Sequence, residues 1–195
     1  MSDRFAKFYQ PLDEFDFRAL VNYWSSEGIN LRNPLTHRVS SISVDGDQVE
    51  TSSELLEATV SDRLPVTFQL WLSDDTDITC RIRFLDDHRV VEEYELDGLC
   101  QNEIDRVLLV IVAKFKVKAV DGGSLFLVGD CEGYTIVMNW DQLSVTGRYE
   151  ERICPDVLGM PIERSVDFRQ CVDTNSVSMR VGACLIITTK PPSVS

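Results

Sequence analysis

Histidine is scarce in this sequence, which has only His37 and His88 among its 195 residues. The chain also lacks a Gly-x-Ser-x-Gly elbow, a phosphate-binding loop and a dinucleotide-binding glycine pattern. A cysteine–histidine nucleophile pair requires a cysteine beside one of the two histidines in space, and no local spacing indicates one. We therefore predict no catalytic residues and no cofactor, with an enzyme kept as an alternative.

Cysteine pairs at the spacing of redox or zinc motifs are absent as well. The six cysteines are Cys80, Cys100, Cys131, Cys154, Cys171 and Cys184. None of them belongs to a Cys-x-x-Cys motif, and the first residues of the chain carry no apolar signal core. We therefore expect reduced, mostly buried thiols, no zinc site and a cytoplasmic protein.

Long apolar runs are missing too. The longest uninterrupted one, residues 107–113, is far shorter than the roughly 20 residues of a membrane-spanning helix, so we predict no membrane association. A content of 44% hydrophobic and 26% charged residues is ordinary for a globular protein. We expect a single domain over residues 1–189 and a disordered tail over residues 190–195.

Three stretches with strand periodicity follow one another in the middle of the chain. In residues 66–72, 78–84 and 90–96, apolar side chains recur at about every second position, which places them on one face of a strand. The short polar links 73–77 and 86–88 favour turns. Because strands joined by such short links must be antiparallel neighbours, we predict a three-stranded meander with one buried face.

The next segment has the periodicity of a helix. From Asn102, which we expect to cap it, to Gly122, apolar residues recur at three- and four-residue steps. Residues 107–120 are rich in β-branched side chains, so a partly extended structure is the alternative. We expect the helix to pack across the apolar face of the meander. The predicted fold class is α+β, with a mainly antiparallel sheet, the meander and later hairpins, covered on one face by the long helix.

Local signals give the remaining elements. We expect the first ten residues to form a short arm, and a helix to span residues 11–28. Residues 38–51 are predicted to form a hairpin and residues 52–59 a capped short helix. Later strands are expected at residues 124–128, 134–140, 162–171 and 176–188.

Negative charge is concentrated in one part of the chain. The net charge is −13, and residues 37–113 hold seventeen acidic but only six basic residues. Direct binding to nucleic acid is disfavoured, because phosphate contacts need a positive surface. A basic protein would instead be attracted to this region. The alternative is that the charges only keep the protein in solution and prevent its sheet edge from pairing.

These observations predict a non-enzymatic protein-binding module, most concretely an acidic inhibitor of the immunity-protein or antitoxin type that binds a basic protein partner. The expected contact residues are Asp74, Asp75, Asp77, Asp86, Asp87, Glu92, Glu93 and Glu95. The alternatives are a secretion or assembly chaperone, and an enzyme that uses carboxylates on the sheet. No metal site is predicted, because the acidic loops 45–47 and 74–77 do not match the spacing of a calcium loop.

Overall fold

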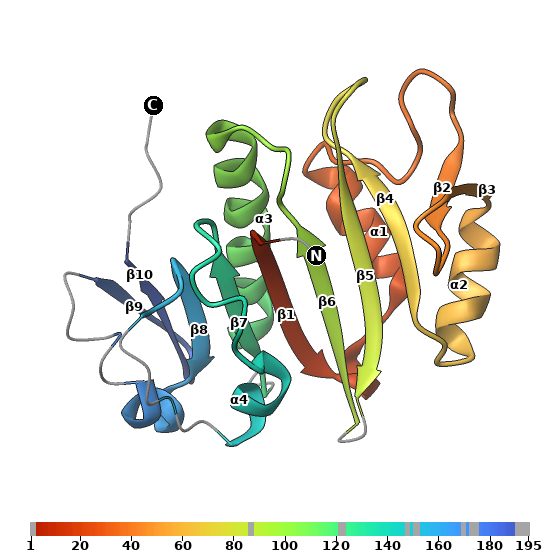
Figure 1. The fold of residues 1–195 in the computed structure, drawn as a ribbon. Helices are drawn as coiled ribbons and strands as arrows, with labels where there is room; N and C mark the ends of the chain where they lie inside the picture. The colour runs from red at the N-terminus through yellow and green to blue at the C-terminus, as the bar shows by residue number, and fades with distance from the viewer. Residues whose placement is uncertain are drawn as a thin grey trace. The chain divides into compact units, whose positions relative to one another are not determined.

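A computed structural model of the chain describes residues 3–85, 88–120, 124–146, 149, 153–168, 171 and 176–189. Contacts within the chain divide it into two units (Figure 1). The inserted unit is Pro11–Glu95, and the terminal unit combines Met1–Gln10 with Leu96–Ser195. The single domain that we predicted over residues 1–189 stays a prediction, because it requires the two units to unfold together. The predicted tail at 190–195 lies outside the described residues.

Within its described residues, the inserted unit has five antiparallel strands in the order β3-β2-β4-β5-β6. Their bounds are β2 Val39–Ile42, β3 Gln48–Thr51, β4 Val66–Trp71, β5 Asp77–Leu85 and β6 Arg89–Glu95. Phe68, Cys80 and Tyr94 lie opposite one another on β4, β5 and β6, and all three are buried. The predicted meander, its register of alternating faces and the β2–β3 hairpin are therefore confirmed.

Helix α1, Phe17–Ser26, packs against the buried face of these strands. Its N-terminus is capped by Asp16, whose carboxylate accepts a hydrogen bond from the Ala19 N–H at 2.8 Å. The Phe17 ring lies edge-on to Phe68 of β4, with ring centroids 5.6 Å apart. Aromatic contacts of this kind bury large side chains in a defined geometry, so α1 provides much of the core that the meander needs.

A second helix of the inserted unit, α2, spans Ser53–Ser61 and is capped by the Ser52 hydroxyl, as the sequence predicted. It ends in a paired hydrogen-bond motif: Leu64 N–H donates to Thr59 and Arg63 N–H donates to Val60. This motif places Arg63 at the left-handed position that glycine usually occupies, with φ of 57°.

The described residues of the terminal unit also form five antiparallel strands, in the order β1-β7-β8-β10-β9. Their bounds are β1 Phe5–Pro11, β7 Phe126–Asp130, β8 Val157–Pro161, β9 Val177–Val181 and β10 Cys184–Thr188. The expected N-terminal arm is wrong, because β1 is a largely buried strand paired with β7. Apolar side chains at Phe5, Ala6 and Phe8 make burial of this segment favourable.

The long helix α3 spans Gln101–Val120 and belongs to the terminal unit (Figure 1). It is helical throughout, so the partly extended alternative is excluded. Its first residue precedes the expected cap at Asn102, and the Cys100 N–H donates instead to the Glu103 carboxylate at 2.8 Å. Phe115 lies edge-on to Phe8 of β1 at 6.3 Å. We expected α3 on the meander, whereas these contacts are with the strands of its own unit.

Two predicted strands of the terminal unit do not form. Residues 134–140 make a turn that leads into helix α4, Trp140–Thr146, and residues 162–168 form a short 3-10 helix. The Asp130 carboxylate accepts hydrogen bonds from the backbone N–H groups of Glu132, Gly133, Tyr134 and Thr135. Because this side chain satisfies the donors that a sheet would use, it stabilises the turn in place of a strand.

One disulfide bond links Cys154 to Cys171, next to the 3-10 helix. The expectation of reduced thiols is therefore wrong for this pair, although the other four cysteines are not joined in disulfide bonds. The pairing depends on how segments on either side of β8 come together, which the 17-residue separation alone does not reveal. Within the described ranges, no helix is both long and apolar enough to cross a bilayer.

Candidate functional site

The predicted acidic contact residues do not form one patch. Asp74 and Asp75 lie in the turn before β5, and Asp86 and Asp87, which are outside the described residues, follow its last residue. β5 has nine residues, so its two ends lie about 26 Å apart, at roughly 3.3 Å per residue. A partner that covers the β4–β5 turn therefore reaches the other end of β5 only through a wide interface.

Glu92 faces the core of the inserted unit rather than solvent. It is 0% exposed, and its carboxylate accepts a hydrogen bond from the Tyr94 hydroxyl. Tyr94 in turn accepts a hydrogen bond from the Trp24 indole at 3.2 Å. Burial, followed by the nearby Glu92 charge, raises the pKa of Tyr94 well above its ordinary value. The prediction of Glu92 as a surface contact is wrong, because Val90, Glu92 and Tyr94 share one face of β6.

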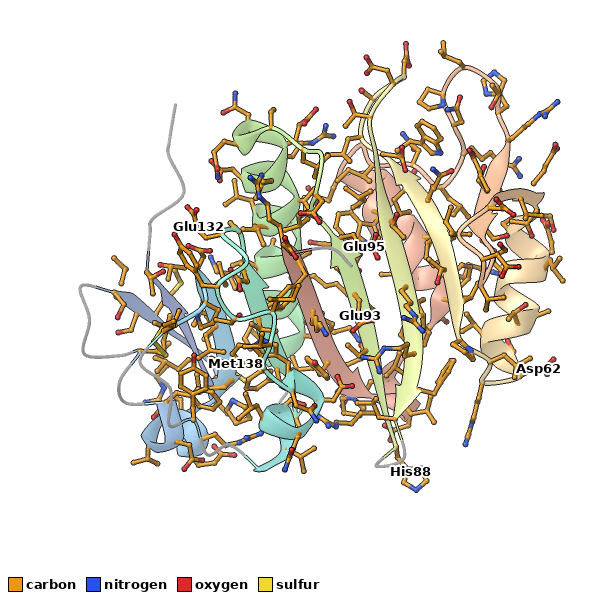
Figure 2. All side chains as sticks on the ribbon, viewed as in Figure 1. Asp62, His88, Glu93, Glu95, Glu132 and Met138 are labelled. Atoms are coloured by element: carbon orange, nitrogen blue, oxygen red, sulfur yellow. A yellow bond between two sulfur atoms is a disulfide. The ribbon has the colours of Figure 1, made fainter. Side chains whose placement is uncertain are left out.

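Glu93 lies on the opposite, polar face of the meander and is held by an ion pair (Figure 2). Its carboxylate accepts two hydrogen bonds from the Arg83 guanidinium, at 2.9 and 2.7 Å. The Glu93 side chain is 16% exposed and the Arg83 side chain is 23% exposed. A bidentate, partly buried pair of this kind stabilises the sheet and leaves little negative charge uncompensated at this position.

Four of the predicted acids lie in or near the β4–β5 turn. Asp74 and Asp75 belong to the turn, Asp77 is the first residue of β5, and Glu95 of β6 lies opposite Thr79; we call these four residues the acidic hairpin end. Hydrogen bonds from Ser73 and Thr76 lower the pKa of Asp75, which keeps it ionised. Partial burial raises the pKa of Asp77, against a hydrogen bond from Gln69 that lowers it. Asp74, Asp75 and Glu95 are exposed.

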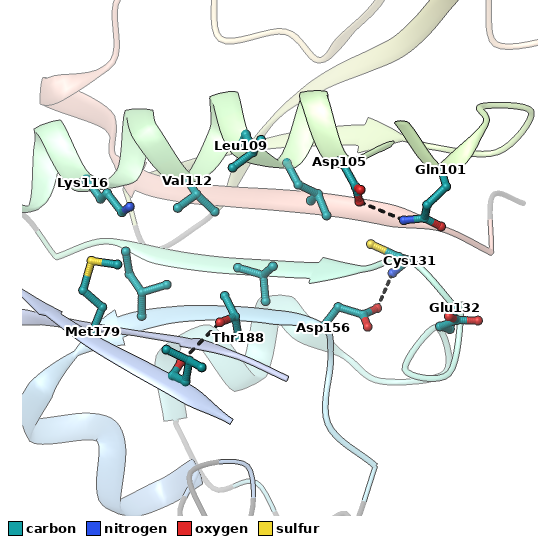
Figure 3. Close-up of a pocket in the computed structure, with 14 residues that line it drawn as sticks. Gln101, Asp105, Leu109, Val112, Lys116, Cys131, Glu132, Asp156, Met179 and Thr188 are labelled. Atoms are coloured by element: carbon teal, nitrogen blue, oxygen red, sulfur yellow. Dashed lines mark hydrogen bonds between the residues drawn. The ribbon is translucent and has the colours of Figure 1, made fainter. Parts of the chain in front are cut away.

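A groove that the sequence analysis did not predict runs along α3 in the terminal unit (Figure 3). Its volume is about 520 Å³, within the range of ordinary ligand sites. Apolar side chains dominate its lining: Leu108, Leu109, Val112, Val157, Val177, Met179 and Ile186. Of the elements that line the groove, only α3 was predicted correctly from the sequence. The strands that complete the groove were predicted only in part.

Acidic groups gather at one end of this groove, around the Cys131 thiol (Figure 3). The Asp156 carboxylate accepts a hydrogen bond from the Cys131 N–H at 2.7 Å, and Asp105 accepts one from the Gln101 side chain at 2.9 Å. Burial, then the charges of Asp156, Asp130 and Asp105, raises the pKa of Cys131 to about 12. The thiol is therefore protonated at neutral pH and is a poor nucleophile.

The inserted unit has a second cavity, of about 650 Å³, near the end of α2. Asp13, Asp16 and Glu57 line it together with Arg63 and His88. Arg63 and His88 have positive φ angles, of 57° and 62°. These conformations follow from the helix end and from the β5–β6 turn, so they do not by themselves indicate a function.

Metal coordination receives no support in the described ranges, where no three His, Cys, Asp or Glu side chains are grouped to hold an ion. Comparisons of the chain with protein-family models, with curated protein sequences and with solved structures give no match.

Proposed function

We propose that this protein is a non-enzymatic binding module that recognises a basic protein through the acidic hairpin end, acting as an inhibitor of the immunity-protein or antitoxin type. The observation that carries the proposal is that four carboxylates, three of them exposed, lie in or near the β4–β5 turn of the meander. Neither of the two cavities described above is lined by these residues. An exposed acidic surface outside a cavity suits a macromolecule better than a small substrate.

The surrounding charges favour recognition of a cation. The whole chain carries a net charge of −13, so its long-range field attracts positively charged partners and repels acidic ones. At the acidic hairpin end, hydrogen bonds hold Asp75 in its ionised form. Charged side chains at the edge of an interface mainly accelerate association, so the proposed contact should depend on ionic strength.

The chemistry of the groove supports binding over catalysis. Its thiol is protonated, and both histidines belong to the inserted unit, whereas the groove belongs to the terminal unit. A chaperone is the second candidate, because chaperones hold apolar segments of their clients and this groove is lined mainly by apolar side chains. Sedimentation separates the two candidates, since the chaperone hypothesis predicts a dimer, whereas an inhibitor can be a monomer.

The proposal is tested with the protein immobilised and lysate of its source cells applied at low and high salt. A stoichiometric basic protein that high salt weakens is the expected result, and it is then purified for kinetics. Asp74→Lys combined with Glu95→Lys should slow its association at least about tenfold at low salt. The matched control is Asp45→Lys with Asp47→Lys, two exposed acids in the β2–β3 turn.

Equal association rates for the wild-type protein and the Asp74/Glu95 variant would overturn the proposed surface. An acidic or neutral partner whose binding is insensitive to salt would overturn the proposed chemistry. Thermal unfolding of each variant checks that the exposed substitutions leave the fold intact.

A further inference from the structure

The groove in the terminal unit follows one face of α3 for four turns. Gln101, Asp105, Leu108, Leu109, Val112 and Lys116 all line it from the helix. These positions are separated mainly by three or four residues, so they form one continuous stripe. From Gln101 to Lys116 the stripe is about 22 Å long, at roughly 1.5 Å per residue. This length suits an extended ligand rather than a compact one.

Three large apolar side chains around the groove are exposed. Leu109 of α3 is 51% exposed, and Val177 and Met179 of β9 are 56% and 45% exposed. β9 is the last strand in the sheet order of its unit, and α3 and β9 are in contact. Apolar side chains that converge on one open groove mark a docking surface more strongly than scattered ones do.

Close packing fixes one end of the groove. A Cβ added at Gly182, in the turn between β9 and β10, would lie 2.6 Å from the Ala119 carbonyl oxygen. Glycine is therefore required here, and it brings this turn against the last turn of α3. The contact holds the two walls, α3 and the β9–β10 hairpin, in a fixed relation.

The charges along the groove are unequal at its two ends (Figure 3). Asp105, Glu132 and Asp156 lie at the end near Cys131, whereas Lys116 lies at the other. An occupant with a cation at the acidic end and apolar groups beside it is therefore complementary in both charge and polarity.

We propose that this groove is a docking site for a segment of another protein that presents two or more apolar side chains followed by a lysine or arginine. The occupant is a protein segment because the groove is long and its apolar walls are open to solvent. This surface belongs to the terminal unit, so the inference extends the proposed function and does not depend on the acidic hairpin end.

The test uses three labelled synthetic peptides of about 14 residues, a length that spans the groove in either helical or extended form. The first carries leucines followed by two lysines, the second has glutamates in place of the lysines, and the third has glutamines in place of the leucines. Fluorescence anisotropy should give saturable binding of the first peptide to the full-length protein. The other two should bind at least about tenfold more weakly, a difference of roughly 1.4 kcal/mol.

Substitutions in the groove locate the binding. Leu109→Gln should weaken the first peptide at least about tenfold, whereas Leu55→Gln on α2, where Leu55 is 59% exposed, should have no effect. Asp105→Asn with Glu132→Gln should remove most of the preference for lysine over glutamate. The control for charge is Asp45→Asn with Asp47→Asn, and Asp74→Lys with Glu95→Lys should leave peptide binding unchanged.

Three results would overturn the inference. They are the absence of saturable binding by all three peptides, equal binding to the Leu109→Gln and Leu55→Gln proteins, and equal binding of the lysine and glutamate peptides. Sedimentation of the protein alone provides a further check. A dimer that dissociates in the Leu109→Gln variant would show that the groove is occupied by a second copy of the chain, which also overturns the proposed occupant.

Discussion

The Tyr94 hydroxyl donates a hydrogen bond to the Glu92 carboxylate, two residues earlier on β6, and both side chains are buried. The same hydroxyl accepts from the Trp24 indole of α1 at 3.2 Å. This arrangement ties a carboxylate on the sheet to the helix that covers it. Of the three glutamates of β6, Glu92 is therefore part of the core, whereas Glu93 and Glu95 lie on the opposite face of the strand.

Tyr94→Phe should destabilise the inserted unit by about 1–3 kcal/mol, because it removes a donor to Glu92 and an acceptor for Trp24 in the core. Urea unfolding measures the change. Tyr134→Phe is the matched control, since Tyr134 is 62% exposed, and it should change stability little. Equal effects of the two substitutions would contradict the structural role of Tyr94.

Stability should fall as the pH rises above about 10, the ordinary pKa of tyrosine in an unfolded chain. In the folded protein burial raises the pKa of Tyr94 well above this value and that of Tyr23 to about 12. Between the unfolded and folded pKa values the folded state binds more protons, so raising the pH favours unfolding. Chemical denaturation at several alkaline pH values measures this slope, and Tyr94→Phe should make it shallower.

Glu93→Lys should destabilise the protein by about 1 kcal/mol or more, because it replaces a bidentate ion pair with Arg83 by a repulsive contact. Asp74→Lys, in an exposed turn, should leave the unfolding midpoint nearly unchanged. Thermal unfolding compares the two variants. A stable Glu93→Lys protein would mean that the ion pair contributes nothing measurable.

Arg63→Gly should stabilise the protein by about 0.5–1 kcal/mol, since its left-handed conformation strains a residue with a side chain. Gly28, which ends α1 with φ of 74°, supplies the reverse experiment. Gly28→Ala should destabilise by a similar amount. Guanidinium unfolding curves of both variants test the sign, and destabilisation by Arg63→Gly would indicate that the Arg63 side chain makes a compensating contact.

Alkylation should find four free thiols in the unfolded, unreduced chain, because Cys154 and Cys171 are joined. In the folded protein the exposed Cys100 should react with iodoacetamide first. Cys131 should react much more slowly until the pH approaches 12, because its pKa is raised to about 12. Peptide mass spectrometry identifies the modified residues, and six thiols in the unfolded chain would contradict the disulfide.

Local patterns predicted the elements whose partners are close in sequence. The alternation in 66–96 gave the meander, and the helical period gave α3, since both are set by neighbouring side chains. The burial of Glu92 could also have been predicted, because every second residue of a strand lies on the same face and Glu92 stands between Val90 and Tyr94 in this spacing. We placed Glu92 on the surface because of its charge, whereas the strand spacing places it on the buried face.

The missed features depend on contacts between distant residues. A strand was expected at 134–140 because the residues of this segment favour extended structure. In the folded chain the Asp130 carboxylate instead accepts hydrogen bonds from backbone N–H groups in this segment, and so stabilises a turn. The groove requires α3 to meet β8, β9 and β10, and the helix was expected on other strands. The disulfide likewise requires a tertiary arrangement.

The pairing of β1 with β7 has a consequence for synthesis of the chain. Phe5 lies opposite Asp130, so β1 has no β7 partner until about 120 further residues have been made. At roughly 5–20 residues per second, this wait lasts on the order of 6–25 s. During that interval the apolar Phe5, Ala6 and Phe8 lack their final neighbours on β7, while the whole of Pro11–Glu95 is already synthesised. β1 therefore waits longer for its β7 partner than any other described strand of its unit waits for a neighbour, so it is a segment that a nascent-chain chaperone would protect.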